Sequence, residues 1–321
     1  MINQQLFNPQ RIIVVGASND VTKPGGKLLK NLIDTNYKGT LMVVNQNQRD
    51  VQGIKAWPSV SDVPEADLAI LAIPAASCVD AVTVLAAEKQ VKAFIIISAG
   101  FSEEGSRGKE LENQLLEIAN RYNACLIGPN CIGVLTSHHA SVFTTPIPKL
   151  HPCGVDFISG SGATAVFIME SAIAKGLLFH SVISVGNSTQ TGIEDVLEYF
   201  DETYDPEHSP NVKLLYMEDI KNPDKLLHHA SSLIRKGCKI AAIKAGSSDA
   251  GSRAATSHTG AMASSDLAVE ALFRKAGIVR CYGREELTTV GCIFMSKTLR
   301  GKNIAIITHA GGPAVMLTDA L

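Results

Sequence analysis

Three short segments of this sequence hold residue types that could handle phosphate groups. Two of them, residues 16–18 and 159–163, are rich in glycine, alanine and serine, and each follows an apolar run and precedes a helical pattern. Small residues let backbone N–H groups approach an anion, and the N-terminus of a helix attracts negative charge. In the third segment, residues 255–261, His258 lies among small residues, and a neutral imidazole can attack a phosphoryl group. Phosphate binding and phosphoryl transfer are the chemistry that these segments indicate.

A carboxylate could orient the histidine. Glu218 and Asp219 follow an apolar run, and a carboxylate that accepts from one ring nitrogen leaves the other nitrogen free to act as nucleophile. Each of these segments by itself could also have an ordinary structural role, as a tight turn, a helix N-cap or, for His258, a surface position. Only their joint presence favours a functional site.

Strands must position these segments, and the sequence predicts two series of them. The expected strands, all rich in β-branched and apolar residues, are residues 11–15, 40–44, 67–73, 92–98 and 124–127, then 155–159, 180–185, 212–217 and 239–244. Helical patterns separate them, for example at residues 103–121. Near-continuous apolar strands alternating with helices predict parallel sheets covered on both faces, in doubly wound α/β units.

The two strand series predict two domains and part of a third. Residues 144–154 contain three prolines, which predicts a linker because proline fixes φ and removes a hydrogen-bond donor. We expect domains at residues 1–128 and 129–299. Residues 300–321 should hold one strand, residues 303–308, and one helix, the first βα unit of a truncated third domain.

Composition excludes several classes of protein. The net charge of −2 gives no reason to expect a nucleic acid or a membrane surface as partner. No apolar run reaches the ~18 residues of a membrane span, and the N-terminus lacks an apolar signal-peptide core. The seven cysteines form no CxxC pair, so we expect no metal site and no disulfide framework. A reducing, cytoplasmic location follows.

The first small-residue turn does not fit a dinucleotide. Of the G-x-G-x-x-G glycines only Gly16 is in register, and the second strand ends in Asn45-Gln46-Asn47 rather than in an acidic residue for the ribose. These departures argue against NAD as the ligand and leave another nucleotide-like molecule as the candidate.

Further turns in the first half of the chain carry a specific resemblance. They occur in the order Gly16-Ala17-Ser18, Pro24-Gly25, Asn45, Ile73-Pro74-Ala75, Ser98-Ala99-Gly100-Phe101 and Gly128-Pro129-Asn130-Cys131. Together they resemble the CoA-binding domain of the succinyl-CoA synthetase α-subunit superfamily, in its NDP-forming acyl-CoA synthetase branch (the ADP-forming acetate–CoA ligase type). The resemblance implies a Rossmann-like domain.

The resemblance also implies where CoA lies in that domain. Gly16, Ala17, Ser18, Pro24 and Gly25 would hold its phosphates, Asn45 would lie by the nucleotide, Ile73, Pro74, Ser98, Ala99 and Gly100 would line the pantetheine arm, and Asn130 and Cys131 would lie near the thiol. The branch usually has Asn-Pro-Lys where this chain has Asn45-Gln46-Asn47. That departure implies weaker CoA binding, or a substitute cation at Lys27.

In the second half, Ser257-His258-Thr259-Gly260-Ala261 matches the family's active-site histidine motif. The resemblance implies a flavodoxin-like domain in which His258 carries phosphate, Glu218 orients the ring, and Ser159, Gly160, Ser161, Gly162 and Ala163 hold the phosphoryl group. Gly186-Asn187 resembles a further family turn, without the acidic residue usual downstream. Gly311 and Gly312 lie in a segment that resembles the family's T-N-A-G-G-P turn, a second phosphate anchor.

The reaction implied by this resemblance is acyl-CoA + ADP + phosphate ⇌ acid + CoA + ATP, through an acyl phosphate and phosphohistidine. The family's ATP-grasp domain, which holds ADP or ATP with Mg²⁺, has no counterpart in this sequence, so we expect it on a further domain or on a partner subunit. An oligomer is also implied. Two alternatives remain open: a succinyl-CoA synthetase α-like subunit, and a non-catalytic CoA-binding regulatory module.

Overall fold

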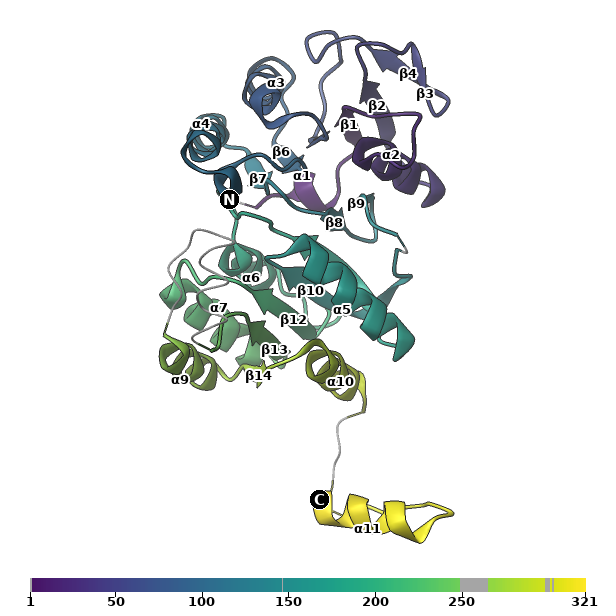
Figure 1. The fold of residues 1–321 in the computed structure, drawn as a ribbon, viewed down its shortest axis with the longest axis vertical. Helices are drawn as coiled ribbons and strands as arrows, with labels where there is room; N and C mark the ends of the chain where they lie inside the picture. The colour runs from purple at the N-terminus through teal and green to yellow at the C-terminus, as the bar shows by residue number, and fades with distance from the viewer. Residues whose placement is uncertain (1, 146, 249–264, 298–300, 302) are drawn as a thin grey trace.

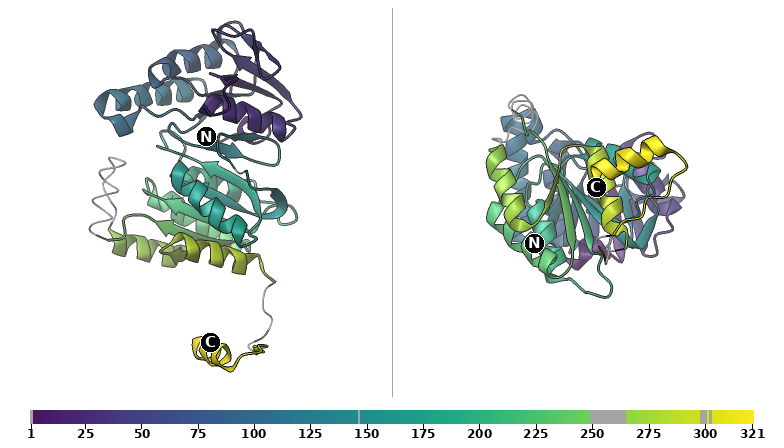
Figure 2. Two further views of the ribbon diagram at one scale, coloured as in Figure 1. Left: turned by 45° about the vertical axis from the view of Figure 1, so that its right-hand side comes forward. Right: turned by 90° about the horizontal axis from the view of Figure 1, so that it is seen from below.

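The computed structural model describes residues 2–145, 147–248, 265–297, 301 and 303–321. Within this part of the chain two seven-stranded sheets form two lobes, and one helix lies apart from both (Figure 1, Figure 2). The chain passes from the first sheet to the second between Ile127 and Gly133. None of the helices in the described residues is long and apolar enough to cross a membrane.

The first sheet is Rossmann-like. Its strands are β1 (Arg11–Val15), β2 (Thr40–Val44), β3 (Asp50–Val51), β4 (Ile54–Trp57), β5 (Leu68–Leu71), β6 (Ala93–Ile96) and β7 (Cys125–Ile127). Their order is β3-β4-β2-β1-β5-β6-β7, with every neighbouring pair parallel except β3 and β4. Without β3, this is the 3-2-1-4-5-6 order of the Rossmann fold, in which ligands bind at the carboxyl ends of the strands.

Helices cover both faces of this sheet because its central strands are buried on both sides. They are α1 (Gln4–Phe7), α2 (Pro24–Asp34), α3 (Ala75–Glu88) and α4 (Ser106–Arg121), with a short 3₁₀ helix at Ser102–Glu104. Leu28 and Leu32 of α2 pack with Ile12 on one face. Val82 of α3 and Leu115 of α4 pack in a second cluster on the opposite face.

The second sheet is flavodoxin-like. Its strands are β8 (Gly133–Leu135), β9 (Ala140–Val142), β10 (Leu150–Ser159), β11 (Phe179–Ser184), β12 (Val212–Met217), β13 (Lys239–Lys244) and β14 (Val279–Cys281). The parallel strands are ordered β11-β10-β12-β13-β14, which is the 2-1-3-4-5 order of flavodoxin. The antiparallel pair β8 and β9 extends the β11 edge.

The helices of the second lobe also lie on both faces of their sheet. They are α5 (Gly162–Ala174), α6 (Ile193–Glu202), α7 (Pro223–Arg235), α9 (Asp266–Ala276) and α10 (Arg284–Met295). Figure 1 shows α5 and α10 on one side and α6, α7 and α9 on the other. One buried apolar cluster joins the lobes, since it contains Ile95 and Ile127 of the first sheet with Val134 and Ile183 of the second.

Several sequence predictions need correction. Leu150–Ser159 is one strand, so the predicted linker at residues 144–154 is wrong in its second half. Pro152 is tolerated there because the register of β10 against β11 shifts between Leu150 and Val155, which frees the intervening residues from ladder pairing. The predicted helix at residues 103–121 begins only at Ser106, because Gly105 has a φ of +104°.

The predicted strand at residues 303–308 is also absent, although the helix after it forms as α11 (Gly311–Ala320). A strand needs a partner for its backbone groups, and residues 303–308 pair with none of the described strands. Short pairs such as β3–β4 and β8–β9 were not predicted, because strands of two to four residues carry too little periodicity.

Candidate active site at the carboxyl ends of both sheets

The turn after β1 brings backbone atoms unusually close to the start of α2. A Cβ on Gly25 would lie 2.2 Å from the Gly16 carbonyl oxygen, and one on Gly26 would lie 2.1 Å from that of Asp20. Gly16 itself has a φ of +85°, a region that favours glycine. The loop can fold against the helix N-terminus only without these side chains, and this leaves a concave backbone surface suited to an anion.

A series of contacts leads from this turn along the carboxyl edge of the first sheet. The Asn45 side chain donates to the Ala17 carbonyl at 2.8 Å. The Ser98 hydroxyl donates to the Ile73 carbonyl at 2.5 Å, and the Asn130 N–H donates to the Ser98 carbonyl at 2.9 Å. Turns that the sequence places far apart therefore adjoin one another.

The Ala72 N–H donates to the Val15 carbonyl at 2.9 Å, so the series connects the turns after β1, β5, β6 and β7. Strand spacing makes its span about 14 Å, which suits an extended ligand. Pro24 and Gly25 begin α2, and Lys27 is half-buried in its first turn. Pro74 is the N-cap of α3, and Gly100 has a φ of +101°.

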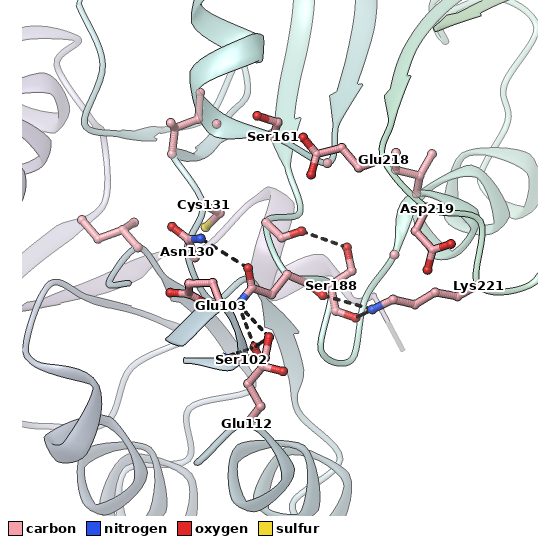
Figure 3. Close-up of a pocket in the computed structure, with 18 of the residues that line it drawn as sticks. Ser102, Glu103, Glu112, Asn130, Cys131, Ser161, Ser188, Glu218, Asp219 and Lys221 are labelled. Atoms are coloured by element: carbon pink, nitrogen blue, oxygen red, sulfur yellow. Dashed lines mark hydrogen bonds between the residues drawn. The ribbon is translucent and has the colours of Figure 1, made fainter. Parts of the chain in front are cut away.

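The series ends at a cavity of about 730 Å³ between the two lobes. Figure 3 shows Ser161 and Glu218 toward one side of it and Ser102, Glu103 and Glu112 toward the other. The residues predicted for the site that line this cavity are Asn130, Cys131, Gly160, Ser161, Gly162, Ala163 and Glu218. The structure thus brings together the predicted end of the CoA path and the predicted phosphate turn.

The N-terminus of α5 opens into this cavity. Ser161 is the N-cap, and its side chain accepts from the Thr164 N–H at 3.4 Å. Ser159 is fully buried, and its hydroxyl donates to the Ser161 carbonyl at 2.7 Å, which holds the turn rather than facing a ligand. The N–H groups of Gly162 and Ala163 begin the helix, where no intrahelical acceptor exists. They are the donors that an anion would meet.

Cys131 lines the cavity as a buried thiol. Its Sγ donates to the Ile96 carbonyl at 3.3 Å, and burial raises its pKa to about 12. A thiol that stays protonated at neutral pH is a poor nucleophile. The environment of Cys131 therefore fits a small buried side chain that lines the site and takes no part in the chemistry as a nucleophile.

The cavity also holds a cluster of polar side chains, of which sequence analysis noted only Asn187, as part of a family-like turn, and missed its partners. Asn187 donates through Nδ2 to Glu103 at 2.6 Å and to Glu112 at 2.7 Å. Burial raises the pKa of the Glu103 carboxyl, but hydrogen bonds from Asn187 and from backbone N–H groups outweigh it and leave the pKa below its usual value. A signal existed for Glu112, which is an acidic residue on the buried stripe of α4.

Some predicted site residues lie elsewhere. His258 falls outside the described residues. Gly311 and Gly312 begin α11, which has no buried residue and lies apart from both lobes in Figures 1 and 2. In the described part of the chain, no group of three His, Cys, Asp or Glu side chains is arranged to hold a metal ion.

Comparison with protein families agrees with this arrangement. Residues 10–137 match the CoA binding domain, and residues 152–294 match the succinyl-CoA ligase like flavodoxin domain. The fold and the site therefore define a CoA-binding protein of the acyl-CoA ligase class.

Individual relatives narrow this class. The chain is 38% identical over 317 residues to the α-subunit of ADP-forming acetate–CoA ligase II from Pyrococcus furiosus, covering 98% of this chain and 67% of that protein. It is 36% identical to ADP-forming acetate–CoA ligase I from Archaeoglobus fulgidus, covering 99% of this chain and 45% of that protein. The chain thus spans about two thirds of a separate α-subunit and less than half of that longer relative.

A solved structure shows the same fold. Dinucleotide-forming acetyl-coenzyme A synthetase 1 from Ca. Korarchaeum cryptofilum, in complex with phosphate and ADP, superposes with a TM-score of 0.89 at 31% identity, over 98% of this chain and 67% of that one. The chain belongs to the ADP-forming acetate–CoA ligase family.

Proposed function

We propose that this chain supplies the CoA site and the phosphohistidine site of an ADP-forming acyl-CoA synthetase. The observation that carries the proposal is the series of adjoining turns from Gly16 to Asn130, which ends in a cavity shared with the N-terminus of α5 and Glu218. An extended thioester could lie along this edge with its acyl end in the cavity. There the helix N-terminus offers donors to phosphate.

The residues have distinct roles in the proposed reaction. The turn at Gly16 and Gly25 binds the phosphates of CoA, and the α5 N-terminus orients inorganic phosphate for attack on the thioester carbonyl. A C–O bond forms, the C–S bond breaks, and the thiol leaves with a proton. The products of this step are an acyl phosphate and free CoA.

His258 then acts as the phosphate carrier. One imidazole nitrogen attacks phosphorus, a P–N bond forms, and the acid leaves as its carboxylate. Glu218 accepts from the other ring nitrogen and stabilises positive charge on the ring. Transfer from phospho-His258 to ADP requires an ATP-grasp part on a further domain or subunit, which would also hold Mg²⁺.

The assembly and its location are part of the proposal. The relative from Pyrococcus furiosus is called a subunit, which supports a partner that carries the nucleotide site. All seven cysteines carry free thiols, which fits the cytoplasm.

A half-reaction tests the proposed function without the partner. The chain is incubated with acetyl-CoA and radiolabelled phosphate, and the protein is then examined for label. We expect label that acid removes and alkali leaves in place, and we expect none in the His258→Ala variant, which should still bind CoA in a calorimetric titration. Acid-stable label, or equal labelling of the variant, would place the phosphate elsewhere.

A further inference from the structure

Asn187 lies where the turn after β11 meets the segment after β6, helix α4 and the segment after β7. Its Nδ2 donates to Glu103 Oε2 at 2.6 Å and to Glu112 Oε1 at 2.7 Å, and its Oδ1 accepts from Asn130 Nδ2 at 3.3 Å. Asn187 follows β11, whereas Glu103 and Glu112 belong to the first lobe and Asn130 lies in the segment that joins the two sheets. One amide side chain therefore forms hydrogen bonds with two carboxylates and with a second amide across the cavity.

Each carboxylate is itself anchored to the backbone beside the cavity. Glu103 accepts through Oε1 from the N–H groups of Gly100 and Phe101, at 2.7 and 3.1 Å. Glu112 has a side chain only 1% exposed, and its Oε1 accepts from the Ser102 hydroxyl at 2.7 Å. Through these groups Asn187 reaches the whole turn that follows β6.

The backbone of Asn187 is held as firmly as its side chain. Its N–H donates to the Pro129 carbonyl at 2.9 Å, and Lys221 Nζ donates to its carbonyl at 3.0 Å. A Cβ on the preceding Gly186 would lie 2.2 Å from the Pro129 carbonyl oxygen, so the two turns are in direct backbone contact. Both turns therefore fix the backbone position from which the amide reaches the carboxylates.

The position requires an amide of this length. Two carboxylates that approach one point repel each other unless donors lie between them. An aspartate would add a third acceptor, and a lysine or arginine would have no acceptor for Asn130. Asparagine has both two donors and an acceptor on a short side chain.

We propose that Asn187 is a positioning residue for the reaction described above. It fixes the turn at Gly100 and Phe101 and the turn at Asn130 relative to the second sheet, so that the thioester and the phosphate at the α5 N-terminus meet in line. The inference rests on the proposed function. It assigns Asn187 to alignment, with no direct contact to the reacting atoms.

Asn187→Asp tests this assignment most directly, because it keeps size and shape while replacing two donors by acceptors. The measured quantity is the single-turnover rate of acid-labile labelling from acetyl-CoA and phosphate. We expect a fall of about 10²-fold, the size associated with misplacement of reacting groups, with CoA affinity changed only a few-fold. Asn123→Asp, which changes an exposed residue, is the matched control and should label at the wild-type rate.

A paired variant provides a rescue. In Glu103→Gln the amide oxygen must face the Gly100 and Phe101 N–H groups, so its NH₂ points to residue 187, where it meets the donor of Asn187. In Glu103→Gln/Asn187→Asp the donor and the acceptor are exchanged, and one hydrogen bond is restored. We expect the double variant to label faster than Asn187→Asp alone.

The pH profile separates positioning from loss of structure. The charged groups around position 187 are Glu103 and Glu112 at the side chain, Lys109 on Glu112, and Lys221 at the backbone carbonyl. Two neighbouring carboxylates raise the pKa of an introduced aspartate, and its protonated form regains a donor. The ratio of the Asn187→Asp rate to the wild-type rate should therefore rise between about pH 8 and about pH 6. Asn187→Ala should show a constant ratio.

The outcomes are distinguishable. If the wild-type chain takes no label, the proposed function fails and the inference with it. If the wild-type chain is labelled and Asn187→Asp is labelled at the same rate, only the role of Asn187 is overturned. A slow variant with a flat pH ratio and no rescue by Glu103→Gln overturns it as well. Should Asn187→Asp not fold, Asn187→Ala replaces it: a reduced rate with retained CoA affinity supports the role, and an unchanged rate overturns it.

Discussion

Replacing Gly25 by alanine adds a single carbon atom to the turn that we propose to bind CoA. At most helical positions this change is favourable by about 1 kcal/mol, because glycine has the larger conformational entropy to lose. At Gly25 the new Cβ would lie 2.2 Å from the Gly16 carbonyl oxygen and 3.1 Å from the Ala72 Cβ. The helix and the turn must therefore separate by about 1 Å to reach van der Waals contact.

The turn has little room to move. The Gly16 N–H donates to the Val44 carbonyl at 3.1 Å, and the Gly16 Cα faces the Ala72 carbonyl so closely that a Cβ there would lie 2.4 Å from its oxygen. Overpacking of this kind costs about 1–3 kcal/mol. Because the obstructing atom belongs to the backbone, we expect the overpacking cost at Gly25 to be about 3 kcal/mol. The free energy of unfolding should then fall by about 2 kcal/mol after the helix gain is subtracted.

CoA affinity should fall with the same change. A shift of about 1 Å lengthens the hydrogen bonds from the turn to a phosphate beyond their useful range. Each bond to a charged group contributes about 1.5–3 kcal/mol, so the loss of one lowers the affinity about 10- to 100-fold. Denaturant unfolding and calorimetric titration with CoA measure the two effects.

Gly301→Ala is the matched control, because nothing lies within 4 Å of a Cβ at that exposed glycine. It should change stability by less than about 0.5 kcal/mol and leave CoA affinity unaltered. The reasoning is refuted if Gly25→Ala binds CoA as tightly as the wild type and unfolds at the same or a higher denaturant concentration.

Three further predictions concern the cavity. Glu218→Gln should slow labelling of the phosphohistidine, by up to about 10⁴-fold, without abolishing it, since an amide still accepts from the ring but cannot stabilise its positive charge; an unchanged rate in rapid-quench experiments would contradict the orienting role. Gly186→Ala should destabilise the chain by about 2 kcal/mol more than Gly176→Ala in denaturant unfolding. Both glycines have positive φ, but only Gly186 lies against a backbone carbonyl. Equal losses of stability would show that the lobes readjust freely. Iodoacetamide at about pH 8 should modify the exposed Cys153 well before Cys131. The Cys131 thiol is buried, with a pKa raised to about 12, and so stays protonated. The reverse order of modification in mass spectrometry would mean that the cavity wall opens.

The local elements of this chain follow from its residue types. The runs at Arg11–Val15, Thr40–Val44, Val212–Met217 and Lys239–Lys244 are strands with the predicted bounds. Apolar β-branched runs between turn residues have few other stable conformations. Because parallel strands place their carboxyl ends at one edge, the strand pattern alone assigns the small-residue turn that follows Val15 to a binding edge.

Pairing between strands that are distant in the chain does not follow from residue types in the same way. Leu150–Gly154 contains a proline and has the pattern of a linker, yet it lies in β10 because the neighbouring strand β11 provides a ladder with a register shift. Residues 303–308 have a good strand pattern and form none, since no described strand pairs with them. A strand is defined by its neighbour, and sequence pattern alone does not supply one.

The sequence by itself determined the two α/β folds, the small-residue turns at Gly16 and Ser161, and the family motif around His258. Each depends on residues close together in the chain. Only the tertiary structure decided that Asn187 lies between Glu103 and Glu112, because hydrogen bonds between residues 84 and 75 positions apart have no local signature. Their geometry follows from how the two sheets pack on a shared apolar core, and that packing is a property of the whole chain.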